Sequence, residues 1–149
     1  MINGNVKRED IYNLPLRVTF YARVSSDENS QADCLEAQIA RYKEIIASHT
    51  NWTYVEGYID EAPGVAVLTK RTSFNCMIED AKAGCFDLVI TKDCTRFARN
   101  TVESIGYTRE LMSNGVAVLF CNDCFCTLEP DADLRLSIML TLATANMKW

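Results

Sequence analysis

The chain has 149 residues, of which 48% are apolar and 23% charged, and its formal net charge at pH 7 is −5. This length suits one domain that buries roughly 68–70% of its unfolded surface, and the acidic balance argues against a protein that binds DNA through a broad basic face. No apolar run reaches the ~20 residues that cross a bilayer and the first ten residues lack the apolar core of a signal peptide, so we expect a cytoplasmic protein with no membrane contact.

Stretches with the spacing of strands alternate along the chain with stretches that have the spacing of helices. Residues 16–21 are β-branched and aromatic, which predicts a first strand. Apolar residues then recur at helical spacing over residues 31–48. The further expected elements, in order, are a strand at 52–59, a helix at 71–83 stopped by Gly84, a strand at 86–91, a helix at 101–113 closed by Asn114-Gly115, a strand at 116–120 and a helix at 133–147. This order predicts an α/β three-layer sandwich, in which a mostly parallel central sheet of four to five strands has helices on both faces.

The expected helix at 133–147 is apolar around most of its circumference, whereas a surface helix has an apolar stripe of only ~100°. Such a helix must be covered on both sides. We expect a second subunit to cover it, with Leu136 or Leu140 on the outward face. The alternative is a central helix buried within one subunit.

Seven cysteines in a chain without a signal peptide predict reduced thiols. Cys121, Cys124 and Cys126 have a spacing that suits part of a metal site or a thiol redox pair. A structural zinc site usually needs four ligands in two spaced pairs, however, and the single histidine, His49, has no partner pattern. We therefore expect no metal and no cofactor. A thiol oxidoreductase is the weakest class considered, because no strand-loop-helix follows Cys124.

Hydroxyl and guanidinium side chains follow two of the expected strands, at the edge of the sheet where α/β proteins usually bind ligands. The first group is Tyr21-Ala22-Arg23-Val24-Ser25-Ser26, and the second is Thr95-Arg96-Phe97-Ala98-Arg99-Asn100. Guanidinium groups match phosphate oxygens and stay charged at any working pH. A serine beside an arginine, with two more arginines three residues apart, therefore indicates attack on a phosphate rather than on a carbonyl.

Five blocks of sequence between about Leu16 and Ala143 resemble the catalytic domain of serine recombinases, the resolvase/invertase family. They are Tyr21 to Ser26, Cys34-Leu35-Glu36-Ala37-Gln38, Asp60-Glu61, Lys70-Arg71 and Arg96 to Asn100. The pattern is most similar to that of the large serine recombinases of mobile elements and phages. We expect a loose leader at residues 1–13 from the sequence pattern, and the resemblance implies a catalytic domain at 14–149 with the C-terminal DNA-binding region of the family absent.

The resemblance also implies a role for each matching residue. Ser25 is the implied nucleophile, the other implied catalytic residues are Arg23, Gln38, Arg71, Arg96 and Arg99, and Lys70 and Lys92 are expected to contact DNA phosphates. The implied reaction is cleavage of a DNA strand through a 5′-phosphoserine, strand exchange and religation, without metal or nucleotide. The implied partners are double-stranded DNA, bound weakly without the absent region, and further copies of the chain, as a dimer and as a tetramer in synapsis.

The sequence departs from the family pattern in three places, and the departure at Thr95 leaves the acid for the leaving group unassigned. Gly64-Val65 stands where the family often has Ser-Gly, Thr95 where resolvases carry an acid, and Thr144-Ala145-Asn146-Met147 where the family has glutamine and glutamates. The hydroxyl missing at Gly64-Val65 and the acidic composition favour the alternative that the chain is a catalytically degenerate α/β module for dimerisation or regulation in a mobile element. The presence of Ser25 and of four arginines favours an enzyme.

Overall fold

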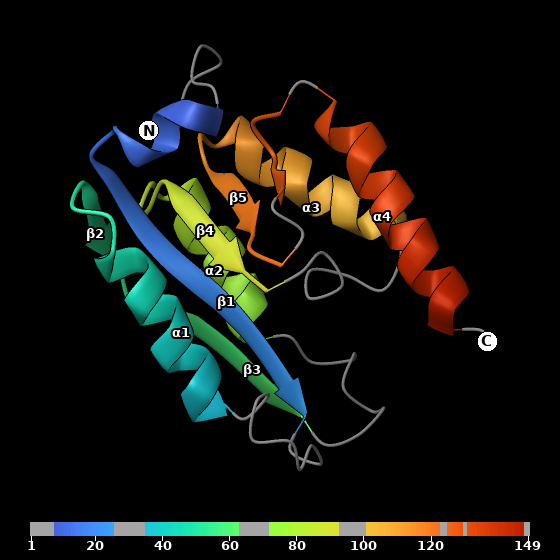
Figure 1. Ribbon diagram of the computed structural model, residues 1–149, viewed down its shortest axis with the longest axis horizontal. Helices are drawn as coiled ribbons and strands as arrows, with labels where there is room; N and C mark the ends of the chain where they lie inside the picture. The colour runs from blue at the N-terminus through green and yellow to red at the C-terminus, as the bar shows by residue number, and fades with distance from the viewer. Residues whose placement is uncertain are drawn as a thin grey trace.

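The computed structural model describes residues 8–25, 35–62, 72–92, 101–122, 125–129 and 131–147, and the statements below concern these residues. A central sheet lies between helices on its two faces, and α4 lies outside α3 (Figure 1). In chain order the elements are the 3-10 helix η1 (Arg8–Tyr12), β1 (Leu16–Ser25), α1 (Leu35–Ala47), β2 (Trp52–Tyr54), β3 (Tyr58–Ala62), α2 (Thr72–Lys82), β4 (Leu88–Thr91), α3 (Thr101–Ser113), β5 (Ala117–Phe120), β6 (Phe125–Cys126) and α4 (Ala132–Met147).

The sheet has six strands in the order β2-β1-β4-β5-β6, and β3 also pairs with β1. The first part of β1 pairs with β2, its second part with β3, and residues Val18 to Phe20 pair with β4 on the other side. All these pairs are parallel, as is β4 with β5, and only the short β6 is antiparallel. The predicted α/β class, with a mostly parallel sheet and helices on both faces, is confirmed.

The sheet has six strands rather than the four to five expected, partly because residues 52–59 form two strands instead of one. Between β2 and β3 the hydroxyl of Thr19 donates to the carbonyl oxygen of Glu56 over 2.9 Å. A Cβ atom at Gly57 would lie 2.2 Å from Cζ of Phe20, so only glycine lets the chain pass this ring. The sixth strand, β6, has only two residues, which is too short for a periodic signal in the sequence.

Alternate residues of the strands supply two separate cores. Val18 and Phe20 of β1 face α1, where Tyr42 and Ile46 pack on them. Tyr21 faces α2 and α3 on the opposite side of the sheet. Residue Ile11 of η1, within the segment that we expect to be a leader, is also buried, and its carbonyl oxygen accepts a 2.7 Å hydrogen bond from the indole of Trp52. Two of the predicted helix stops, Gly84 and Gly115, have φ of 77°, where glycine is favoured.

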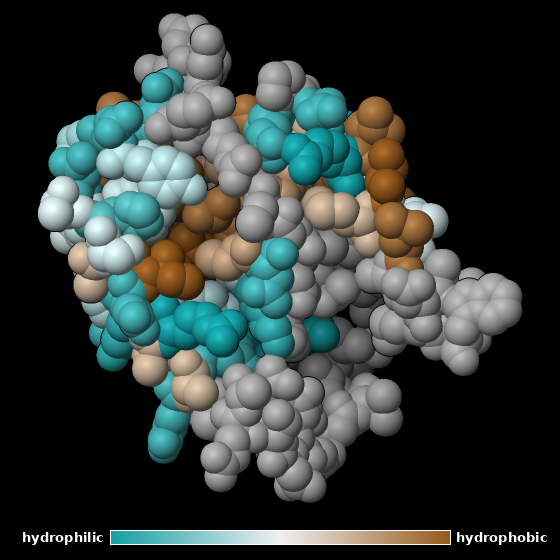
Figure 2. Space-filling view, in the orientation of Figure 1, coloured by the Kyte–Doolittle hydropathy of each residue, from teal (hydrophilic) through white to brown (hydrophobic). Residues whose placement is uncertain are grey.

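Helix α4 packs on α3 through one face only. Leu136 is 1% exposed and belongs to the core beneath α2 and α3. Leu134, Ile138 and Leu142 are 61%, 51% and 59% exposed, and their spacing of four residues sets them on one stripe. Figure 2 shows apolar side chains along this helix at the right of the view. Of the two residues expected to include an outward-facing one, Leu136 is buried, and the side chain of Leu140 lies outside the described residues.

Within the described part of the chain, no helix combines the length and the apolar content that crossing a membrane requires.

A buried carboxylate joins the amino ends of β1 and β4. Asp87 accepts hydrogen bonds from the backbone N–H of Arg17 over 2.9 Å and from its guanidinium over 3.2 Å. Burial alone would raise the pKa of Asp87, but the hydrogen bonds from Arg17 outweigh it and hold the pKa below its ordinary value of 3.8. A carboxylate with a lowered pKa stabilises the fold above its unfolded pKa, and this contribution is lost as the pH falls through the folded pKa.

We predict that Asp87→Asn lowers the free energy of unfolding at pH 7 by about 1.5–3 kcal/mol, the usual contribution of hydrogen bonds to a charged group. The difference from the parent should shrink as the pH falls below about 4, because the parent then loses the same charge. Urea unfolding at pH 7 and at pH 3 measures both values, and Asp131→Asn, at an exposed carboxylate, is the control. A difference that stays constant with pH would contradict the assignment.

Candidate active site

Strand β4 ends beside the middle of β1, at the point where the chain changes direction across the sheet, and β1 continues past it to Ser25. From β1 the chain passes first to β2 and β3 on one side, and afterwards to β4 and β5 on the other. The hydroxyl of Thr91, the last residue of β4, donates to the carbonyl oxygen of Tyr21 over 2.9 Å. Open α/β sheets bind their ligands at such a topological switch point, so this edge is the candidate site.

Two of the predicted catalytic residues lie on β1 at this edge. Ser25 is the last residue of the strand and pairs with Ala62 of β3. Arg23 is half-buried and pairs with Asp60. Side chains alternate along a strand, so Arg23 extends to the same side as Tyr21, toward α2. Lys70, Arg71, Arg96 and Arg99 lie outside the described residues.

The structure brings Gln38 and Lys92 together in one cavity of about 150 Å³, called here the α1 pocket. Its lining residues come from α1 and from the residues that follow β4 and β5, namely Ala37, Gln38, Arg41, Tyr42, Lys92, Cys121 and Asn122. The N–H groups of Cys121 and Asn122 donate to the carbonyl oxygens of Thr91 and Lys92, each over 2.8 Å. These bonds fix the two strand ends that form one wall. Arg23, which the structure describes, is not one of the residues that line the α1 pocket.

Asp60 has a structural role that the sequence pattern did not assign. Its buried carboxylate accepts hydrogen bonds from the hydroxyl of Tyr21 over 2.7 Å and from the N–H groups of Ser73 and Phe74 over 2.9 and 3.1 Å. The last two groups are in the first turn of α2, where backbone N–H groups lack partners within the helix. Asp60 therefore joins the middle of β1 to the start of α2, the helix that Arg71 precedes in sequence.

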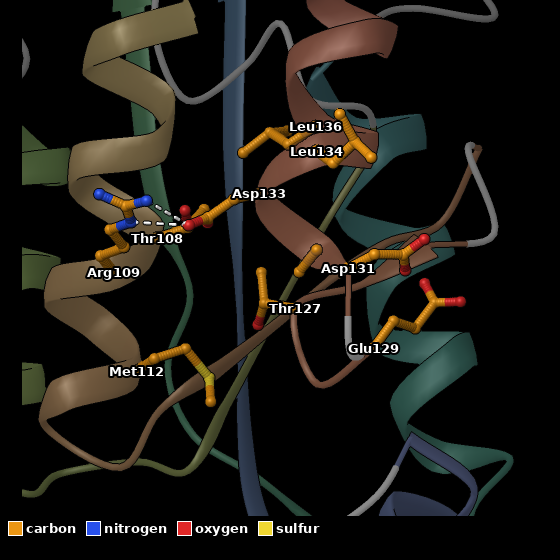
Figure 3. Close-up of a pocket in the computed structure, with 10 residues that line it drawn as sticks. Thr108, Arg109, Met112, Thr127, Glu129, Asp131, Asp133, Leu134 and Leu136 are labelled. Atoms are coloured by element: carbon orange, nitrogen blue, oxygen red, sulfur yellow. Dashed lines mark hydrogen bonds and ion pairs between the residues drawn. The ribbon is translucent and has the colours of Figure 1, made fainter.

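A second cavity, of about 500 Å³, lies between α3, α4 and the segment before α4 (Figure 3). Arg109 of α3 reaches across its rim, and its Nε and Nη2 atoms donate to Asp133 over 2.8 and 2.5 Å. Thr108, Met112 and Leu136 also line this cavity. Exposed ion pairs of this kind contribute little to stability, about 0–1 kcal/mol. None of the predicted site residues that the structure describes lines this second cavity.

The cysteines that suggested a metal or redox site are only partly described. Cys126 is fully buried in the core on the α1 side of the sheet, and Cys121 is half-buried in the α1 pocket, while Cys124 lies outside the described residues. In the described ranges, no cluster of three histidine, cysteine or carboxylate side chains is arranged to hold a metal. Cys126 is a small apolar side chain in the core.

Fold and site together define a doubly wound α/β domain with a serine and cationic side chains at its switch point. The sequence matches the family model described as "Resolvase, N terminal domain" over residues 18–148. The chain belongs to this family, and its fold is that of a serine recombinase catalytic domain. The resemblance drawn from the sequence blocks is thereby confirmed. No curated protein matches the chain.

Solved structures of three recombinase domains are similar to this chain. A resolvase family site-specific recombinase from Streptococcus pneumoniae has 26% identity and a TM-score of 0.69, over 89% of this chain and 91% of the other. The N-terminal catalytic domain of TP901-1 integrase has 20% identity and a TM-score of 0.66, over 89% and 97%. The C-terminal catalytic domain of ISC1926 TnpA, an IS607-like serine recombinase, has 20% identity and a TM-score of 0.59, over 89% and 85%.

We predict that Asp60→Ala lowers the free energy of unfolding by about 2–4 kcal/mol, because it removes a helix cap and leaves the buried Tyr21 hydroxyl without its acceptor. Tyr21→Phe removes only the hydrogen bond between Tyr21 and Asp60 and keeps the bonds from Ser73 and Phe74 to Asp60. In a double-mutant cycle measured by urea unfolding, the two substitutions should therefore be coupled by about 1 kcal/mol. Strictly additive effects would show that the Tyr21–Asp60 hydrogen bond does not stabilise the protein.

Proposed function

We propose that the chain is the catalytic domain of a site-specific DNA recombinase in which Ser25 cleaves the DNA backbone. The Ser25 hydroxyl oxygen attacks a phosphorus atom, the bond to the 3′ oxygen breaks, and that oxygen leaves with a proton as a 3′ hydroxyl. The serine then carries the 5′ phosphate. Attack by the 3′ hydroxyl of an exchanged strand reverses the step and releases Ser25, so religation needs no nucleotide.

The observation that carries this proposal is the family match over residues 18–148, together with the position of Ser25 as the last residue of β1 at the switch point. A phosphodiester under attack gains negative charge, and fixed cationic donors that meet this charge are usually the largest catalytic contribution. We assign this role to Arg23, Arg71, Arg96 and Arg99. Gln38, the remaining catalytic residue that the resemblance implies, is proposed to hold the DNA strand beside the cleaved phosphate, while Lys70 and Lys92 are proposed to contact neighbouring DNA phosphates.

The proposed partners are double-stranded DNA and other copies of this chain. The exposed stripe of Leu134, Ile138 and Leu142 on α4 supports self-association, because a contiguous exposed apolar patch marks an interface. We propose a dimer through this stripe and a tetramer when two DNA sites are joined.

We predict that the chain, fused to a sequence-specific DNA-binding region, forms a covalent adduct with its site that protease removes and that Ser25→Ala abolishes. Binding of the fusion to DNA should be unchanged, because the serine contributes chemistry rather than affinity. Gel separation of denatured complexes measures the adduct, and Ser26→Ala is the matched control. An adduct that persists in Ser25→Ala, or moves to Ser26, would contradict the assignment of Ser25 as the nucleophile. Failure of the parent fusion to form any adduct would favour the catalytically degenerate module.

We predict that Ile138→Glu or Leu142→Glu converts a self-associating chain to monomer without lowering its melting temperature, because both side chains are exposed. Leu136→Glu should instead unfold the chain, since it places a charge in the core. Sedimentation equilibrium at several concentrations measures the mass. Val102→Glu is the control, because Val102 is an exposed apolar residue on α3, outside the stripe. A parent chain that is monomeric at all concentrations would show that the stripe is not an interface.

A further inference from the structure

We propose that the α1 pocket binds a non-scissile phosphate of the DNA backbone, and that Arg41 is the residue that recognises it together with Lys92. This inference rests on the proposed function for the identity of the ligand as DNA. It adds a phosphate subsite and a substrate-positioning residue, Arg41, which none of the sequence blocks that resemble the family includes.

The size of the α1 pocket selects a small ligand. Its volume is about 150 Å³, whereas pockets for cofactors and drug-sized molecules usually measure roughly 300–1,000 Å³. A water molecule takes up about 30 Å³ in the liquid, so the pocket has room for about five waters. This space accommodates a phosphate group with some water, but not a nucleoside.

The charge of the α1 pocket selects an anion. Arg41 and Lys92 both line it, and none of its described lining residues is a carboxylate, although the whole chain has a net charge of −5. The Arg41 side chain is exposed, and within the part of the chain that the structure describes its guanidinium has no ion-pair partner. A guanidinium fork matches two phosphate oxygens, and an ammonium adds a point charge.

The α1 pocket also has a fixed polar floor. Gln38 is 7% exposed, so its amide is held within the structure and not on the surface. Tyr42 is buried as well, and its ring stacks on Phe20 with 5.0 Å between centroids. Gln38 and Arg41 are three residues apart on α1, a spacing that sets them on one side of the helix. The helix therefore presents an amide and a guanidinium to the same space.

The position of the α1 pocket relative to Ser25 shows why its phosphate is not the one that is cleaved. Phe20 of β1 pairs with Ile90 of β4. Lys92 follows Ile90 by two residues and Ser25 follows Phe20 by five, so Ser25 lies three residues further along the strand direction than Lys92. At about 3.3 Å per residue, the two positions differ by about 10 Å along the strands. This separation equals about three steps of a DNA strand, which rises 3.4 Å per nucleotide. The pocket therefore positions the strand a few nucleotides from the cleaved bond.

The test uses the 149-residue chain and a short, fluorescently labelled DNA duplex in an anisotropy titration at several low salt concentrations. Arg41→Gln should weaken binding about three- to tenfold and reduce the slope of log affinity against log salt by about 1, the value for one lost phosphate contact. Arg41→Lys should restore the slope but not the full affinity. Lys43→Gln is the matched control: it removes one charge from the same helix, but Lys43 lines a different groove, beside Trp52 and Tyr54. Equal effects of Arg41→Gln and Lys43→Gln would overturn the proposal, as would a parent chain that binds no duplex at the lowest salt.

A second readout locates the phosphate. Cys121 lines the α1 pocket, so duplex DNA should slow its alkylation, measured by mass spectrometry of the peptides, and should slow it less in Arg41→Gln. Cys76 and Cys85 are exposed and do not line the α1 pocket, so they serve as internal references. Inorganic phosphate is titrated in parallel. Protection of Cys121 by phosphate but not by DNA would overturn the proposal, because the pocket would then be a site for free anions.

The adduct assay of the fused chain separates this inference from the proposed function. If Arg41→Gln weakens DNA binding as expected while the parent fusion forms no adduct, the proposed function fails and the subsite stands. If Arg41→Gln binds DNA and forms the Ser25 adduct as the parent does, the subsite fails and the proposed function stands.

Discussion

Strand β1 constrains the whole domain, because it pairs with three other strands and supplies both cores. Its residues alternate between the α1 side and the α2 side, so they must be apolar or fully hydrogen-bonded over most of the strand. The charged side chains of β1, Arg17 and Arg23, lie toward its two ends, and Thr19 in its buried part hydrogen-bonds to the carbonyl oxygen of Glu56. The buried middle of β1 thus leaves its carboxyl end, beyond the ends of β4 and β5, as the place where reactive groups can stand.

Local patterns predicted most of the elements, and non-local contacts explain where the predictions were wrong. Residues 101–113 form α3 with the expected bounds, because helix periodicity and a following glycine are both local signals. The division of residues 52–59 depends on the ring of Phe20, which lies far away in sequence but beside Gly57 in space. Strand β6 exists only because β5 provides a partner.

The candidate site was predictable in its motif residues but not in its supporting contacts. Ser25 and Gln38 stand in recognisable blocks, whereas the cap that Asp60 places on α2 requires knowledge of which strand end meets which helix. Arg41 stands out only once Lys92 is known to share a cavity with it. Helix α4 is apolar on most faces, so its sequence does not show that Leu136 is buried and Ile138 exposed. That difference depends on where α3 lies.

The Arg109–Asp133 ion pair and the buried side chain of Leu136 both hold the first half of α4, so a tilt of this helix would turn about that half. The helix has 16 residues and at 1.5 Å per residue is about 24 Å long. A tilt of about 10° therefore moves its far end by about 4 Å relative to its first turn. Because the pair is exposed, salt screens it over a Debye length of about 8 Å at physiological ionic strength. Salt therefore weakens one of the contacts that hold α4, while the burial of Leu136 in the core is unaffected by it.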